Sequence, residues 1–139
     1  MIDPNSWSEM MVRKLILVAS AFALAAPGVA YAHHSFAAFF NPDKIIKVKG
    51  KVTSFKFANP HGTIVLDVPE GGTVREWRVE TNAPVVLMRG GWSRSIIKPG
   101  DVVTIEGWAA RDGKPYLRLR QAFDEQGNRI GSAPFGITG

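Results

Sequence analysis

Apolar and polar residues alternate along five stretches of this chain. In the longest stretch, Ile46, Val48, Val52, Phe55 and Phe57 are separated by lysines and other polar residues. A period of two residues is typical of a β-strand that buries one face and exposes the other. Segments rich in Gly, Pro, Asn and Asp, which favour turns, separate the stretches. The pattern predicts five strands, at residues 44–57, 63–68, 73–80, 102–109 and 116–123.

The segment between the third and fourth predicted strands follows a different pattern. Residues 83–89 do not alternate, Pro84 stands in what would be the first turn of a helix, and two glycines follow. Proline is favoured at the start of a helix and glycine just beyond its end, so we predict one short helix here. Gly50, inside the first strand, predicts a bulge or kink. The composition from about residue 124 onward predicts an irregular tail.

Five strands with a short helix between the third and fourth match the order of a small OB-like β-barrel. A closed barrel also leaves no unpaired strand edge, which an open sheet of this size would expose. We therefore predict an all-β fold with a five-stranded OB-like barrel, and keep a small open β-sandwich as the alternative. The alternation places ten side chains in the core: Val48, Val52, Phe55, Ile64, Leu66, Trp77, Val79, Val103, Ile105 and Leu117.

The beginning of the chain has the parts of a secretory signal peptide. Arg13 and Lys14 precede a largely apolar run at residues 15–26, and the small residues Ala30 and Ala32 then match the pattern that signal peptidase cleaves. The apolar run reaches about 18 Å as a helix. A bilayer has a hydrocarbon core of about 30 Å. We therefore predict cleavage after Ala32, with an uncleaved N-terminal anchor as the alternative.

Cleavage would divide the chain into a signal peptide, residues 1–32, and a single domain, residues 33–139. Residues 1–10 add nothing to the signal, so the initiator is Met1, Met10 or Met11. Export predicts a periplasmic protein with no membrane span in its mature form. The chain has no cysteine, which excludes disulfides and cysteine-based metal or catalytic sites. Export also argues against nucleic acid as a partner, although the formal net charge is +5.

All three histidines stand at positions suited to metal binding. Cleavage makes His33 the N-terminal residue, and an α-amine with an ordinary pKa of about 8 is partly unprotonated at neutral pH. The amine and the Nδ1 atom of His33 can chelate one ion, and His61, in a predicted Asn-Pro-His-Gly turn, can supply a third nitrogen. Such nitrogen ligands favour Cu(II) among the divalent first-row ions. The sequence thus predicts a copper site formed by His33 and His61. His34 would be an auxiliary ligand, or would donate a hydrogen bond that orients one of the ligands.

A second interpretation needs no metal. The histidines would then be polar residues of a flexible start and a structural turn, and the protein would be a non-enzymatic accessory module that contacts a small ligand or a partner protein. Its candidate contacts are the barrel face, the loop at Gly90, Gly91 and Trp92, and the tail residues Phe135 and Ile137. An enzyme is the least favoured class, because no acid–base pair or nucleophile stands out in the sequence.

The chain also resembles a known family. The stretches HHSFAAFFNPDK, KGKVTSFKFANPHGTIVLDV, EWRVE and LMRGGWSRSIIKPGDVVTIEG, with the turn at residues 111–113, resemble bacterial exported proteins of the DUF6152 family. The resemblance covers nearly all of the predicted mature chain. It implies a periplasmic β-barrel domain with His-His-Ser and Asn-Pro-His motifs, which fall on His33, His34, Ser35, Asn59, Pro60 and His61.

Overall fold

The computed structural model describes residues 36–136, and this part of the chain is all-β with few helical residues. The predicted signal peptide, His33, His34 and Ile137 lie outside the described residues. The strands are β1 (Phe40–Lys56), β2 (Thr63–Glu70), β3 (Thr73–Glu80), β4 (Val102–Ala110), β5 (Tyr116–Phe123) and β6 (Arg129–Ile130), and helix α3 spans Pro84–Arg89. Between residues 36 and 136, no helix is both long enough and apolar enough to cross a membrane.

The five predicted strands and the predicted helix are all present, with two additions. Residues 36–39 form a short helix, which the sequence prediction missed. The predicted irregular tail contains β6, which pairs with β5 after a tight turn. In that turn the Asp124 carboxylate accepts hydrogen bonds from the backbone and side-chain nitrogens of Asn128, and Gly127 adopts a φ of 86°. These contacts return the chain toward β5, so six strands form rather than five.

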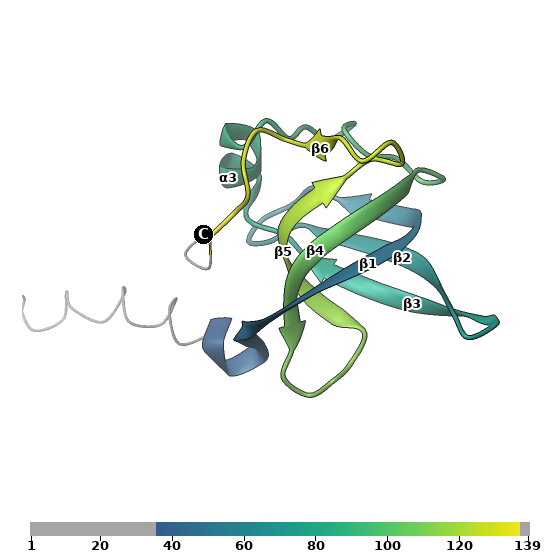
Figure 1. The fold of residues 1–139 in the computed structure, drawn as a ribbon. Helices are drawn as coiled ribbons and strands as arrows, with labels where there is room; N and C mark the ends of the chain where they lie inside the picture. The colour runs from purple at the N-terminus through teal and green to yellow at the C-terminus, as the bar shows by residue number, and fades with distance from the viewer. Residues whose placement is uncertain (1–35, 137–139) are drawn as a thin grey trace, which may run out of the picture. The chain divides into compact units, whose positions relative to one another are not determined.

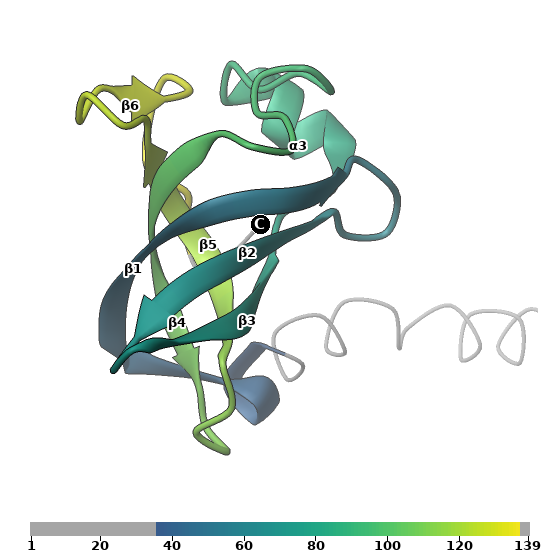
Figure 2. The ribbon, with the colours of Figure 1, turned by 90° about the vertical axis from the view of Figure 1, so that its right-hand side faces the viewer.

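All six strands belong to one sheet with the order β3-β2-β1-β4-β5-β6, and neighbours in this order are antiparallel. β3 also pairs in parallel with β5, at Arg78–Tyr116, Val79–Leu117 and Glu80–Arg118. Each of the first five strands therefore pairs with at least two others along some part of its length. Figures 1 and 2 show β1 as a long curved ribbon that runs beside β4 and then beside β2.

β1 changes partner at Lys51, which is paired with both Val102 of β4 and Asp67 of β2. The predicted bulge does not fall at Gly50, because the register between β1 and β2 shifts between Val52 and Ser54 instead. At Gly50 the backbone of β2 comes close: an added Cβ would lie 2.7 Å from the carbonyl oxygen of Asp67. Glycine is needed there because any side chain would push the two strands apart.

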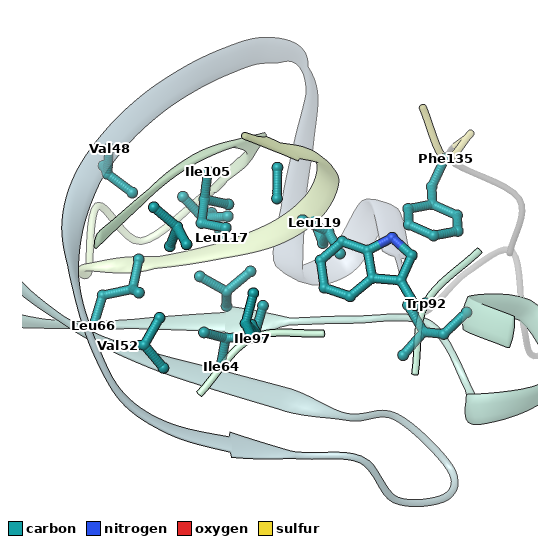
Figure 3. Close-up of a cluster of buried hydrophobic side chains, with 14 of the residues drawn as sticks. Val48, Val52, Ile64, Leu66, Trp92, Ile97, Ile105, Leu117, Leu119 and Phe135 are labelled. Carbon is teal, nitrogen blue, oxygen red and sulfur yellow. The ribbon is translucent and has the colours of Figure 1, made fainter. Parts of the chain in front are cut away.

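The core lies between the inward faces of the strands (Figure 3). Eight of the ten predicted core residues are buried, and Phe55 and Trp77 are partly buried and pack against the others. The predicted register of the strands is therefore confirmed, since a shift of one residue would have exposed every one of these side chains.

Two residues predicted as possible partner contacts belong to the core instead. Trp92 and Phe135 are buried, with their ring centroids 6.3 Å apart. Figure 3 shows the two rings side by side at the end of the core. The backbone of Phe135 also donates a hydrogen bond of 2.7 Å to the carbonyl oxygen of Arg120. Both rings are therefore part of the chain's own core.

Candidate functional site

His61 lies in the turn between β1 and β2, directly after the cis peptide bond between Asn59 and Pro60. The next residue, Gly62, accepts a hydrogen bond of 2.9 Å from the backbone of Thr81. A Cβ on Gly62 would lie 2.5 Å from the hydroxyl oxygen of Thr81, so only glycine lets the turn approach the end of β3 this closely. This approach brings the His61 side chain beside the last residue of β3, Glu80.

The imidazole of His61 contacts the carboxylate of Glu80. The distance between His61 Nδ1 and Glu80 Oε1 is 3.0 Å, and the side chains are 44% and 23% exposed. A carboxylate at this distance favours the imidazole tautomer with its proton on Nδ1. The Nε2 atom then keeps its lone pair, which is the state in which histidine binds a metal ion.

Glu80 is itself held by two residues of β5. Arg118 NH1 donates a hydrogen bond of 2.7 Å to Oε1, and the Tyr116 hydroxyl donates to Oε2. Arg118 also donates to the carbonyl oxygen of Thr81, at 2.8 Å, and to the side-chain oxygen of Asn82. The side chain of Arg118 is only 8% exposed. These contacts fix the position of the carboxylate that orients His61.

Burial and charge in this network act on two pKa values. Burial raises the pKa of the Tyr116 phenol far above its ordinary value, and the hydrogen bond to the Glu80 carboxylate raises it further. Burial lowers the pKa of Arg118, and the negative charge of Glu80 opposes that effect. A guanidinium stays protonated throughout the physiological range. The network therefore consists of a neutral phenol and a cation around one carboxylate.

The network lies on the outward face of β3 and β5. Val79 and Leu117 point into the core, and side chains alternate along a strand, so Glu80, Tyr116 and Arg118 point the other way. They are nevertheless partly or fully buried. Residues 36–40, which lead into β1, provide part of the cover.

That segment packs on the outward face through aromatic contacts. The ring of Phe36 meets the ring of Trp108 edge to face with centroids 5.4 Å apart, and the ring of Phe40 lies 5.2 Å from that of Tyr116. Arg111 holds the same segment: its backbone donates to the carbonyl oxygen of Phe39 at 2.9 Å, and its Nε to that of Ala37 at 2.6 Å. Residues 36–40 therefore lie against Trp108 and Tyr116.

Of the three predicted ligands, the structure describes His61 alone. Within residues 36–136 there is no group of three His, Asp or Glu side chains that could hold a metal ion. Sequence reasoning missed Glu80, Tyr116 and Arg118, which it treated as ordinary strand positions. The sequence does show that these three polar residues lie on the outward faces of two predicted strands. The alternation does not show that the two strands, β3 and β5, are neighbours.

Comparison with known proteins places the chain in a family. A model of the family described as "Family of unknown function (DUF6152)" matches residues 21–117, which is more than half of the chain. The chain belongs to this family. The match includes His33, His34 and His61, and it ends just after Tyr116. The DUF6152 match confirms the resemblance drawn from the sequence motifs. Comparison with curated proteins found no match.

Solved structures similar to this DUF6152 protein are distant. One is the complex of TiaS with tRNA(Ile2) and ATP, at 17% identity and a TM-score of 0.44, covering 61% of this chain and 19% of that one. Another is Rim1, a mitochondrial single-stranded DNA binding protein from S. cerevisiae, at 13% identity and a TM-score of 0.45, covering 65% of this chain and 96% of that one. This chain thus spans about a fifth of the length of the TiaS chain.

Proposed function

We propose that this protein is an exported, periplasmic copper-binding protein, in which the mature N-terminus and His61 hold one copper ion. His33 would supply its α-amine and Nδ1, and His61 would supply Nε2, with His34 as an auxiliary ligand. The observation that carries the proposal is the 3.0 Å contact between His61 Nδ1 and the Glu80 carboxylate. A histidine that ligates a metal through one ring nitrogen usually donates from the other to such a group.

The anchoring of the N-terminal segment supports the same proposal. Phe36 is held against Trp108, and Phe40 against Tyr116, whose hydroxyl binds the same carboxylate as His61. Residue 33 precedes Phe36 by three residues, which span about 10 Å when extended. A mature N-terminus at His33 would therefore begin three residues before the aromatic contacts that lead to Tyr116.

The chemistry of the donors favours copper. An amine and two imidazoles are nitrogen ligands of intermediate softness, and among the divalent first-row ions they bind Cu(II) most tightly. The chain has no cysteine that could compete for the ion. Export after cleavage at Ala32 would place the protein in the periplasm, where reducing thiols of the cytosol do not compete for copper.

The fold that carries this site is proposed to be an OB-like barrel. Its support is the ring of pairings β1-β2-β3-β5-β4-β1, together with helix α3 between β3 and β4. β6 would then be an addition at the β5 end of the sheet.

Copper titration of the processed protein tests the function. A chain that begins at His33 is compared with the same chain acetylated at its N-terminal amine, and with a His61→Ala variant. We expect tight binding of one Cu(II) by the first chain and an affinity at least tenfold weaker in the other two. The electron paramagnetic resonance spectrum of the first chain should show several nitrogen ligands, and the spectrum of the acetylated chain should show fewer.

Equal and weak binding by all three chains would refute the copper site. The function would then be that of a binding module without metal. Protein recovered from the periplasm with residues 1–32 still attached would also refute it, since the amine of His33 would not exist.

A further inference from the structure

A groove lies on the outward face of four neighbouring strands, away from the His61 turn. It has a volume of about 520 Å³ and is lined by residues of β1, β2, β3 and β4. This volume falls within the range of small-molecule sites, which is about 300–1,000 Å³. The groove crosses β1 at residues 49–51, where that strand changes its partner from β4 to β2.

The floor of the groove is apolar. Pro69 and Val74 are paired across β2 and β3, and Val102 of β4 lies on the other side of β1. Val74 is 65% exposed, one of the most exposed large apolar side chains among the described residues. Since Leu66 and Val68 face the core, Asp67 and Pro69 face outward, so the groove is on the solvent side of the sheet.

Two lysines border this apolar floor. Lys49 and Lys51 are both exposed and stand two residues apart on one face of β1. The ion pairs within residues 36–136 include neither of them, whereas Lys47 of the same strand is paired with Glu106. Asp67 also lines the groove, which leaves a net charge of one positive unit at its rim. Lysine stems add apolar surface and keep their ammonium groups in water.

We propose that this groove binds a monomeric amphiphilic anion, an acyl carboxylate of the fatty-acid type, with its chain on Pro69 and Val74 and its carboxylate beside Lys49 and Lys51. An apolar surface on β2 and β3, with two cations beside it on β1, matches one negative head group on an apolar tail. An anion without a tail would leave Val74 exposed, and a neutral apolar ligand would leave both ammonium groups unused. This inference does not depend on the copper site.

Titration calorimetry with dodecanoate, below its micelle concentration, tests the site on the full protein. Acetate serves as a head group without a tail, and dodecyltrimethylammonium as the same tail with a cationic head. We expect saturable binding of dodecanoate alone. Lys49→Gln and Lys51→Gln should each weaken it three- to fivefold, since a surface ion pair is worth at most about 1 kcal/mol.

Matched variants separate the groove from the general surface. Val74→Ser should weaken dodecanoate binding about fivefold, and Asp67→Asn should strengthen it. Lys56→Gln on the same strand and Val85→Ser on α3 change an exposed residue of the same type outside the groove, and both should leave binding unchanged. All of these side chains are exposed, so the variants should fold normally.

Four results would overturn the proposal. The first is no binding of dodecanoate, and the second is equal weakening by the control variants. The third is binding of dodecyltrimethylammonium as tight as that of dodecanoate, which would mean that the apolar surface alone attracts the ligand. Capture of the protein by anionic phospholipid vesicles, without binding of monomeric dodecanoate, would likewise reject it in favour of a membrane surface. A His61→Ala variant should bind dodecanoate normally, which keeps this test separate from that of the copper site.

Discussion

Replacing Glu80 by glutamine tests the carboxylate at the centre of the network. The change keeps the size of the side chain and one oxygen acceptor, but removes the charge that balances Arg118. The guanidinium of Arg118 is 8% exposed, so it is nearly excluded from water. It would keep its hydrogen bonds to the carbonyl oxygen of Thr81 and to Asn82. A buried cation without a counter-ion is among the costly defects in a folded protein.

The expected magnitude follows from this geometry. Removing one partner of a fully buried ion pair costs about 3–5 kcal/mol. The side chain of Glu80 is 23% exposed and the amide still accepts a hydrogen bond, so we expect a loss of about 2 kcal/mol from the free energy of unfolding. For a domain of this size that loss lowers the melting temperature by about 10 °C. Urea denaturation followed by tryptophan fluorescence measures it.

Glu76→Gln is the matched control. Glu76 lies on the same strand and also faces an arginine, but its side chain is 60% exposed and its contact with Arg78 is 3.4 Å long. The expected loss is below about 0.5 kcal/mol, because solvent screens this pair. If Glu80→Gln destabilised the protein no more than Glu76→Gln, the network would not hold β3 against β5, and the reasoning about the position of His61 would fail with it.

Two further predictions concern titration. In a chain that begins at His33, Tyr116 is the only tyrosine, so phenolate absorbance at high pH reports on it alone. We expect no ionisation near its ordinary pKa of about 10, and ionisation at a lower pH in Glu80→Gln than in the unchanged protein. Burial by itself would raise the pKa of Glu106, but hydrogen bonds from Lys47, Arg120 and a glutamine outweigh it and hold the pKa below the ordinary value. A carboxyl with a lowered pKa in the folded state contributes stability that is present above its unfolded pKa and is lost as the pH falls through its folded pKa. Glu106→Gln should therefore reduce the free energy of unfolding at pH 7 and make that free energy less dependent on pH in the acid range. Urea denaturation at several pH values measures both effects. An unchanged dependence on pH in the acid range would refute the role given to Glu106.

The alternation of residues predicted the strands and the core because each of those features is local. β3 and β5 begin and end at the predicted residues. A period of two identifies a strand and its buried face from a few consecutive residues. The additions at residues 36–39 and 129–130 escaped this reasoning, because each depends on contacts with distant parts of the chain: Phe36 on Trp108, and residue 130 on Ala122.

The site required a different kind of information. The alternation correctly put Glu80 and Arg118 on outward faces, where solvated polar residues are the usual outcome. What makes them a network is the parallel pairing of β3 with β5, which joins residues 38 positions apart and which no local pattern specifies. The same pairing is needed before the turn at His61 has a carboxylate beside it. A histidine in a turn is an ordinary surface residue, and it becomes a candidate ligand only when a buried arginine and a tyrosine from another strand hold its neighbour in place. The candidate metal ligands could thus be proposed from the sequence, whereas the carboxylate beside His61 could be found only in the folded chain.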